Sequence, residues 1–339
     1  MSTSQQFTLQ ENSIKAAYAY PEGKRIRCRL CPRLCLLSEG QEGFCHGRKV
    51  IGGELLVTNY GQAVSIAIDP IEKKPLFHFH PGEIILSLGP NACNLSCKFC
   101  QNADISQGRM PTRYVPLEEL VALSVRQHSI GVSFTYSEPL MWYEYIRDSA
   151  PLIHEQRGVV VLVTNGYLCE EPLRELLPHV DALNVDLKSS REEFYRRLCG
   201  GHLEDVLRTI RISVEMGCHV EVTHLVVTGE NDNEENIRAI RDMVADIHPR
   251  IPLHLSRYFP HHRFHNPATP VPFLLKAREI CLERLPFVYV GNVLLEGTED
   301  THCPVCNTLV ISRLGYRVNI QNLSHGRCGK CGEELGIVR

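Results

Sequence analysis

Short apolar runs alternate with amphipathic segments through the middle of this sequence, and the alternation predicts strands that are each followed by a helix. The runs are rich in β-branched residues, as buried parallel strands are, and they lie at residues 84–89, 132–136, 159–164, 182–187, 220–227 and 253–258. Apolar residues three and four positions apart predict helices at residues 116–127, 141–155, 172–177, 203–216 and 234–247. The pattern therefore predicts an α/β fold with a partial (β/α)6 barrel, and a doubly wound sheet is the alternative.

The two ends of the chain differ from this middle part, so we expect three domains. Residues 1–82 are predicted to form a Cys-rich N-terminal extension, and residues 83–297 to form the core. Residues 298–339 are short and rich in Gly and Cys, which predicts a separate metal module of the zinc-ribbon or rubredoxin-like type. A module of about 40 residues buries little apolar surface, so a bound metal would supply much of its folding free energy.

Cysteine is the unusual feature of the composition. The chain has 15 Cys among 339 residues, and eleven of them fall into three short clusters. No apolar run is long enough to span a membrane and the first residues lack a signal-peptide core, so we expect a cytoplasmic protein without a membrane partner. In that reducing compartment clustered cysteines are more often metal ligands than disulfides. The net charge of −3 gives no basic excess, so we expect no nucleic-acid partner.

The central cluster consists of Cys93, Cys97 and Cys100, which follow the first predicted core strand. Barrel active sites are built at the carboxyl ends of the strands, so this position favours a reactive site. Three thiolates can bind three irons of a [4Fe–4S] cluster and leave the fourth iron open to a ligand. The alternative is a structural zinc site with a distant fourth ligand, such as His78 or His80.

The C-x3-C-x2-C spacing, with an aromatic residue before the last cysteine, resembles the signature of the radical S-adenosylmethionine (SAM) superfamily. This resemblance implies that the open iron binds the methionine part of SAM. It also implies that one electron from the cluster cleaves the sulfonium and yields a 5′-deoxyadenosyl radical, which abstracts hydrogen from the substrate. Phe99 would lie against the adenine. In such enzymes the cofactor carries the chemistry, and the protein positions it and excludes water.

Two further matches lie at the ends of the second and third predicted strands. Glu138 stands where the superfamily has a Gly-Gly-Glu motif, so the resemblance implies a contact with the methionine ammonium of SAM. Tyr136 and Ser137 replace the two glycines, which departs from the motif. Asn165 ends the third strand within a Thr-Asn-Gly sequence, which is also an ordinary turn.

The later strands supply four more candidate contacts for SAM. Asp186 and Lys188 resemble the Asp-x-Lys of glycyl-radical activating enzymes, and a local ion pair is the alternative. His224 and Arg257 lie in the fifth and sixth strands and are candidates for the ribose or carboxylate of SAM. The alternative for both is an ordinary strand residue. All these positions lie at or near the carboxyl ends of strands, as a single active-site mouth requires.

Four cysteines flank the core on each side. The N-terminal set is Cys28, Cys31, Cys35 and Cys45. Four thiolates complete a tetrahedral site, so we expect structural zinc there, with an auxiliary iron–sulfur cluster as the alternative. The C-terminal set is Cys303, Cys306, Cys328 and Cys331. Its two Cys-x-x-Cys pairs predict zinc, and a single iron of the rubredoxin type is the alternative.

Motifs along nearly the whole chain resemble the radical SAM member of the AmmeMemoRadiSam system, a family similar to the pyruvate formate-lyase activating enzymes. The motifs are Cys-x-x-Cys-Pro-Arg-Leu-Cys at residues 28–35, Asp-Pro-Ile-Glu-Lys-Lys-Pro at 69–75, Thr-Tyr-Ser-Glu-Pro at 135–139 and Leu-Ser-Arg-Tyr-Phe-Pro at 255–260. The resemblance implies Memo-like and AMMECR-like partner proteins, a protein or peptide substrate, and an electron donor such as flavodoxin or ferredoxin. A glycyl-radical-enzyme activase and a non-enzymatic zinc-rich scaffold are the alternatives.

Overall fold

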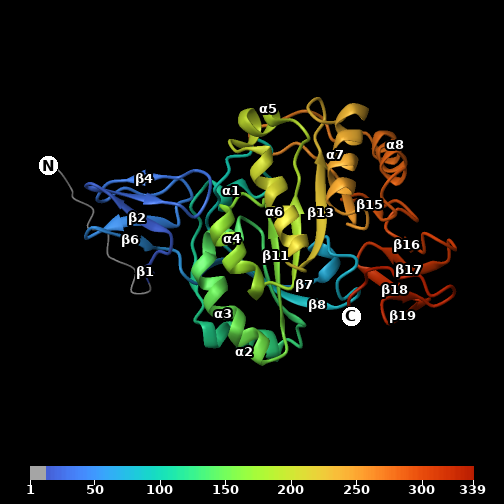
Figure 1. Ribbon diagram of the computed structural model, residues 1–339, viewed down its shortest axis with the longest axis horizontal. Helices are drawn as coiled ribbons and strands as arrows, with labels where there is room; N and C mark the ends of the chain where they lie inside the picture. Colours follow the sequence, from blue (N-terminus) through green and yellow to red (C-terminus); the bar gives the residue numbers. More distant parts are fainter. Residues whose placement is uncertain (1–12) are drawn as a thin grey trace.

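The computed structural model describes residues 13–339 and arranges them in three parts along the long axis of the molecule (Figure 1). Small β-sheets of the N-terminal region lie at one end, a large α/β unit forms the middle, and a second set of short strands lies at the other end. The two outer parts are therefore separated by the central unit.

A nine-stranded sheet forms the centre of the fold, in the order β15-β14-β13-β12-β11-β10-β8-β7-β9. Its parallel strands are β8 (Ile84–Pro90), β10 (Gly131–Phe134), β11 (Val159–Thr164), β12 (Ala182–Asp186), β13 (His219–Val226), β14 (Leu253–Arg257) and β15 (Val288–Gly291). Two antiparallel strands, β7 (Gln62–Pro70) and β9 (Arg113–Tyr114), extend the sheet beyond β8. All six predicted core strands are confirmed, each within two residues at either end.

The longer helices connect successive parallel strands. They are α2 (Leu117–Arg126), α3 (Tyr143–Glu155), α4 (Glu170–Leu176), α6 (Leu203–Glu215), α7 (Glu234–Ile247) and α8 (Val271–Leu282). Short helices fill the loops: α1 (Ala103–Ser106), α5 (Glu192–Phe194), the 3-10 turns η1 (Ile71–Lys73), η2 (Pro139–Trp142) and η3 (Leu177–His179), and the π-helical turn η4 (Tyr195–Cys199). Helix α7 illustrates why they form: Asn233 caps its first turn by accepting from the Asn236 N–H at 2.9 Å, and its apolar residues are buried three and four positions apart.

The strand order decides between the two predicted architectures. From β8 to β15 the parallel strands follow one another in the sheet in sequence order, with no reversal. Because such crossovers are right-handed, the connecting helices gather on one face of the sheet. A doubly wound sheet reverses its strand order at a switch point, so that alternative is wrong. Within the described residues the two edge strands, β15 and β9, do not pair with each other, so the sheet is open.

The outer parts consist of short antiparallel strands. At the N-terminal end, β1 (Ile14–Lys15), β6 (Glu54–Val57) and β5 (Arg48–Ile51) form one sheet, and β2 (Ala19–Glu22), β3 (Arg25–Cys28) and β4 (Leu36–Leu37) form another. At the C-terminal end lie β16 (Thr301–His302), β17 (Leu309–Leu314), β18 (Arg317–Ile320), β19 (Leu323–Ser324) and β20 (Arg327–Cys328). Strand β7 belongs to the central sheet although it precedes residue 83, so the sheet begins before the predicted domain boundary. The three-domain division stays a prediction.

The C-terminal strands dock beside the amino end of β8. The backbone N–H of Val338 donates to the His78 carbonyl at 2.8 Å, and the backbone N–H of His80 donates to the Val338 carbonyl at 2.8 Å. Phe77 packs in one buried apolar cluster with Tyr289 and Ile311. The aromatic and histidine residues at 77–80 therefore pack inside the protein.

Buried Glu221 on β13 fixes the same segment to the interior of the sheet. Its carboxylate accepts from the backbone N–H groups of Phe77 at 3.0 Å and His78 at 2.7 Å, and it also contacts His254 Nε2 at 2.6 Å and His219 Nε2 at 3.0 Å. Although burial alone opposes ionisation, these partners hold the pKa of Glu221 well below its usual range. Residues 77–78 are therefore held by Glu221 of β13 and by the backbone of Val338.

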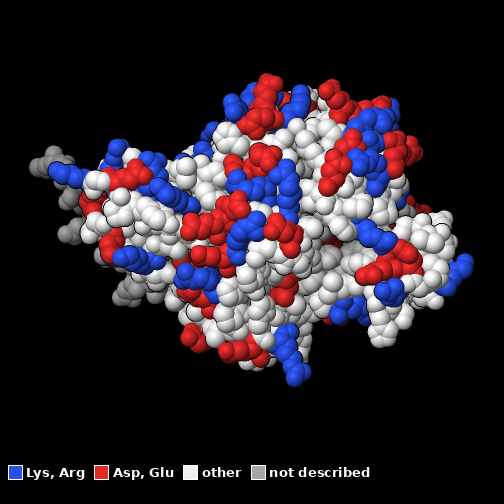
Figure 2. Space-filling model, in the orientation of Figure 1, with Lys and Arg blue, Asp and Glu red and all other residues white. Residues whose placement is uncertain are grey.

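The outer surface mixes charges of both signs. In Figure 2, Lys and Arg side chains are interspersed with Asp and Glu over the face shown, which agrees with the small net charge. Among the helices of residues 13–339, none is long and apolar enough to cross a membrane.

One buried ion pair joins the N-terminal sheets to the central unit. Arg48 on β5 donates to both carboxylate oxygens of Glu144 on α3, at 2.6 and 2.8 Å. Both side chains are 1% exposed. Two further atoms of the pair bond to Ala17, whose N–H donates to Glu144 and whose carbonyl accepts from Arg48 Nη1, each at 2.8 Å. The pair is therefore a fixed joint between the two parts.

We expect Glu144→Gln to lower the free energy of unfolding by about 3–5 kcal/mol, because the substitution leaves the Arg48 charge buried without its counter-charge. Anaerobic urea denaturation followed by circular dichroism measures the change. The control is Lys15→Gln, which breaks an exposed ion pair with Glu54 and should cost no more than about 0.5 kcal/mol. Equal effects of the two substitutions would contradict a joint at Arg48 and Glu144.

Candidate active site

The loop that carries Cys93, Cys97 and Cys100 begins directly after β8, at the carboxyl edge of the parallel strands. Cys97 is buried and the other two cysteines are partly exposed. All three are free thiols. Their position is the one that the sequence predicts, at the edge of the sheet where parallel-strand enzymes collect their reactive groups.

The loop has little regular structure of its own and is held by a distant segment. The backbone N–H of Ser96 donates to the Cys199 carbonyl at 2.8 Å, and the N–H of Lys98 donates to the Leu198 carbonyl at 2.9 Å. Gly200 ends η4 with a φ of +71°, and a Cβ there would lie 2.8 Å from Ser96 Oγ. Glycine thus permits both the left-handed backbone and the close approach to the loop.

Each outer cysteine of the loop receives a polar contact at its sulfur. The backbone N–H of Leu95 donates to Cys93 Sγ at 3.4 Å, and Asn165 Nδ2 lies 3.7 Å from the same sulfur. Ser106 Oγ lies 3.2 Å from Cys100 Sγ. Hydrogen bonds to thiolate sulfur stabilise the anionic ligand and tune the potential of an iron–sulfur cluster. The donor set therefore fits a cluster held by thiolates.

Cys199 lies outside the three cysteine clusters, so the sequence gives no sign of a role for it. The structure places its buried thiol beside Cys97, and a hydrogen bond from Cys199 lowers the pKa of the Cys97 thiol. Cys199 lies outside the C-x3-C-x2-C motif, so Cys93, Cys97 and Cys100 stay the expected ligand set, with Cys199 as a neighbour of one ligand.

Lys188 and Asp186 form an ion pair at the end of β12, with Nζ and Oδ2 2.9 Å apart. Burial disfavours the ammonium, but Asp186 and the thiols of Cys97 and Cys199 outweigh it and hold the pKa of Lys188 well above its usual range. The local ion pair foreseen as an alternative is therefore present. The same ammonium also lies close enough to Cys97 to act on it electrostatically.

Glu138 follows β10 and is 1% exposed. Its Oε1 accepts from the Leu140 N–H at 3.0 Å and from Thr164 Oγ1 at 2.6 Å, whereas its Oε2 accepts only from the Asn165 N–H at 2.8 Å. Burial raises the pKa of this carboxyl to about 7. Because a carboxylate has about four acceptor sites, Oε2 keeps one for a further donor such as an ammonium group.

Asn165 connects this carboxylate to the cysteine loop. Its Nδ2 donates to Asn94 Oδ1 at 2.9 Å, and Asn94 Nδ2 donates to the Tyr167 carbonyl at 2.6 Å. Asn94 is fully buried, so its amide has exchanged water for these partners. Asn165 of the Thr-Asn-Gly sequence thus contacts both Cys93 and Glu138.

Tyr136 explains the departure from the glycine-rich motif. Its backbone adopts a φ of +73°, a conformation in which glycine is common, and its hydroxyl donates to Asp69 at 2.6 Å. Lys74 donates to the same carboxylate at 2.6 Å and lies 4.7 Å from the centre of the Tyr136 ring. The motif residues at 69–75 and 135–139 therefore meet, and these contacts stabilise the backbone conformation that glycines would otherwise permit.

His224 does not face the site. On β13, Glu221 bonds to Phe77 and Thr223 bonds to Asn184, so both side chains lie on one face of the strand. Because side chains alternate along a strand, His224 points to the other face. There its Nδ1 lies 2.8 Å from the Leu187 carbonyl and its Nε2 lies 3.2 Å from Asn236 of α7. Both ring nitrogens have protein partners, so the structure gives no support to a role in cofactor binding.

Phe99 and Arg257 have protein contacts at the same edge. The Phe99 ring is buried, with its centre 5.6 Å from that of Phe194 and 6.5 Å from that of Phe264. Arg257 ends β14, where its Nε donates to the Thr269 carbonyl at 2.9 Å. A role for either residue in binding SAM stays a prediction.

The basic loop after β14 contacts the cysteine loop, which the sequence did not show. Arg263 N–H donates to the Lys98 carbonyl at 2.9 Å, and His261 Nδ1 lies 3.1 Å from the Cys100 carbonyl. These are contacts with the backbone, so no side-chain motif marks them in the sequence. These contacts hold the cysteine loop in addition to those from Leu198 and Cys199.

A fourth zinc ligand from His78 or His80 is excluded by position. Both residues precede β8, whereas the cysteine loop follows it, and the seven residues of this strand span about 20 Å. His78 is buried with Nε2 2.6 Å from the Tyr289 hydroxyl and Nδ1 3.0 Å from the Leu335 carbonyl. Burial lowers its pKa to about 3.

The C-terminal cysteines form a compact tetrad. Their ligand atoms all lie within 4.8 Å of one another, a property that no other group of three or more His, Cys, Asp or Glu shares within residues 13–339. The Cys303 and Cys331 sulfurs are 3.5 Å apart, and the Cys306 and Cys328 sulfurs are 3.6 Å apart. Four thiolates around one ion at about 2.3 Å would be separated by about 3.8 Å, so the tetrad fits a single metal ion.

The cysteine loop lies within the segment of the chain that matches a known superfamily. Residues 89–244 match the radical SAM superfamily. An uncharacterized protein of Methanocaldococcus jannaschii is 40% identical over 95% of this chain and 98% of its own length. The pyruvate formate-lyase-activating enzyme of Clostridium pasteurianum is 26% identical over 46% of this chain and 67% of its own length.

Two solved structures share the fold at low sequence identity. A radical SAM methyltransferase from Sphaerobacter thermophilus superposes with a TM-score of 0.51 at 18% identity, over 63% of this chain and 67% of that chain. Streptococcus suis SuiB bound to S-adenosylmethionine gives a TM-score of 0.51 at 14% identity, over 66% of this chain and 53% of that chain. From its α/β core and these matches, the chain is a radical SAM enzyme, of the same family as the Methanocaldococcus jannaschii protein.

Proposed function

We propose that this enzyme holds a [4Fe–4S] cluster with Cys93, Cys97 and Cys100 and binds SAM at the fourth iron. When bound, the cluster and SAM would supply reductive cleavage to a 5′-deoxyadenosyl radical for hydrogen abstraction. The observation that carries the proposal is the three-thiol loop at the carboxyl edge of the sheet, with polar contacts at the sulfurs of its two outer cysteines.

The protein side chains around the loop position the reactants. The free acceptor site of Glu138 Oε2 would take the methionine ammonium of SAM. Asn165 keeps that carboxylate and Cys93 in a fixed relation, because its backbone bonds to one and its side chain to the other. Lys188 adds positive charge next to the Cys97 thiolate and Asp186. These groups bind, orient and neutralise charge.

We further propose that the substrate is a protein or peptide. The likeness to pyruvate formate-lyase-activating enzymes supports this, because an activating enzyme acts on another protein. Memo-like and AMMECR-like partners, and a flavodoxin or ferredoxin as electron donor, belong to the same proposal and rest on the motif resemblance. An activase for a glycyl-radical enzyme is the second candidate. Membership of an enzyme superfamily argues against the zinc-rich scaffold.

The ligand assignment predicts opposite effects for two neighbouring cysteines. We expect Cys97→Ala to lose the cluster that responds to SAM, and Cys199→Ala to retain it, because Cys199 lies outside the three-cysteine motif. Electron paramagnetic resonance of the reduced protein, with and without SAM, is the measurement. If Cys199→Ala also abolishes the SAM-dependent signal and its iron, the cluster has four protein ligands and the proposed function fails.

The buried carboxyl predicts a pH dependence of SAM binding. Because the pKa of Glu138 is raised to about 7, the acceptor is ionised above pH 7 and protonated below it. Affinity for SAM should therefore fall as the pH drops from 8 to 6, approaching tenfold per pH unit below the pKa. Glu138→Gln should bind SAM about 10–100-fold more weakly at pH 8, as loss of a charged hydrogen bond implies, and should lack this pH dependence.

Anaerobic titration calorimetry at pH 6, 7 and 8 measures this effect. The matched control is Glu83→Gln, which changes an exposed carboxylate at the amino end of β8 and should leave both affinity and pH profile unchanged. An unchanged affinity in Glu138→Gln would remove this residue from the SAM site.

A further inference from the structure

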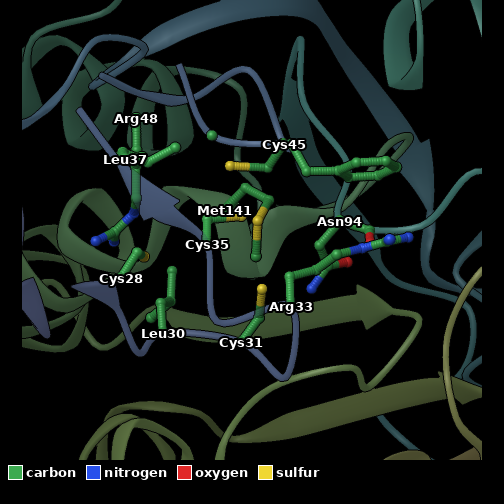
Figure 3. Close-up of a pocket in the computed structure, with 12 residues that line it drawn as sticks. Cys28, Leu30, Cys31, Arg33, Cys35, Leu37, Cys45, Arg48, Asn94 and Met141 are labelled. Carbon is green, nitrogen blue, oxygen red and sulfur yellow. The ribbon is translucent and has the colours of Figure 1, made fainter. Parts of the chain in front are cut away.

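The four N-terminal cysteines surround one pocket in the N-terminal part of the protein (Figure 3). Cys28 ends β3, Cys31 and Cys35 lie in the loop between β3 and β4, and Cys45 lies before β5. Three of them are buried and all four are free thiols. Met141, from η2 of the central unit, also lines the pocket. We call this arrangement the cysteine cage.

The distances between its sulfurs distinguish the cysteine cage from a four-Cys zinc site. Four thiolates on one zinc ion lie about 3.8 Å apart, as a metal–sulfur distance of about 2.3 Å dictates. The C-terminal tetrad meets this condition, but no three ligand atoms of the cage lie within 4.8 Å of one another. The cysteines of the loop at residues 93–100 are likewise more widely spaced. Wide spacing is what thiolates bound to different irons of one cluster require.

The lining of the cage also suits an anionic cluster. Arg48 lines the pocket, and within the described residues its Nε is buried without a hydrogen-bond partner. Arg48 is 1% exposed. A buried donor without a partner is costly, and cluster sulfides or thiolates would satisfy it.

The cage adjoins the active-site loop. Arg33 Nε donates to the Asn94 carbonyl at 2.8 Å, and Asn94 lines the cage and directly follows Cys93. The backbone N–H of Cys169 donates to the Leu30 carbonyl at 3.0 Å, which ties the cage to the segment after β11. A group bound in the cage would thus lie on the other side of Asn94 from the proposed SAM site.

We propose that the cysteine cage binds an auxiliary [4Fe–4S] cluster through Cys28, Cys31, Cys35 and Cys45, and that only the C-terminal tetrad binds zinc. This departs from the zinc expected there from sequence. The proposal concerns a second metal site and stands independently of the SAM chemistry at Cys93, Cys97 and Cys100.

The test counts metals in full-length protein that is purified and reconstituted without oxygen. Wild-type protein should contain about eight irons, as two [4Fe–4S] clusters require, and one zinc. The triple variant Cys93→Ala/Cys97→Ala/Cys100→Ala leaves the cage untouched and should retain about four irons with the Mössbauer spectrum of a cluster. Wild-type protein with about four irons and two zinc ions, and a triple variant without iron, would overturn the proposal.

Two further variants locate the metals. Cys31→Ala/Cys35→Ala should keep about four irons that respond to SAM, and Cys303→Ser/Cys306→Ser should lose zinc without losing iron. If Cys31→Ala/Cys35→Ala does not fold, the triple variant alone still decides the question. If instead the SAM proposal fails and the cage proposal holds, wild-type protein and triple variant both contain about four irons, and SAM alters the spectrum of neither.

Discussion

The active-site loop depends on backbone hydrogen bonds that other segments supply. A loop with three cysteines in eight residues cannot fix its own conformation, because it forms almost no hydrogen bonds within itself. Ser96 and Lys98 donate to the end of η4, Asn94 accepts from Arg33, and Lys98 accepts from Arg263. Segments from the N-terminal part, from the middle and from the region after β14 thus converge on one loop. The positions of the thiols are consequently a property of the whole fold.

A second set of buried polar contacts holds the opposite edge of the sheet. The carboxylate of Glu221 on β13 accepts from the N–H groups of residues 77–78, and the backbone N–H of Val338 in the C-terminal part donates to the His78 carbonyl. Buried polar groups of this kind are stable only when all partners are present. The C-terminal strands therefore complete a network that starts inside the sheet. A metal bound by their tetrad would lie at the amino edge, about one strand length from the active-site loop, and this distance favours a structural role for it.

The sequence predicted the elements better than the orientation of side chains. Strand β11 and helix α7 match their predicted bounds because their apolar periodicity is strong. The contacts of His224 with Leu187 and Asn236 could not be foreseen, because a strand buried on both faces carries no signal for which face is the interior. Cys199 was missed for a different reason: η4 is a single π-helical turn, and only its contact with Ser96 and Lys98 brings the thiol to Cys97. Such tertiary contacts leave no periodic pattern in the chain.

The cysteine sets show the same limit for metal sites. A Cys-x-x-Cys spacing occurs at all three sets and a Cys-x3-Cys spacing at the first two, so spacing along the chain favours a metal without naming it. Spacing in the fold is more informative, since it reflects whether the ligands meet at one ion or surround a larger group. The tetrad closes on itself through two tight turns, where Asn307 N–H donates to the Cys303 carbonyl and Gly332 N–H to the Cys328 carbonyl. The cage draws its cysteines from a hairpin and a separate turn, with Met141 of the central unit between them. Zinc requires nothing more than the first arrangement, whereas the wider spacing of the second fits the iron–sulfur cluster that we propose for it.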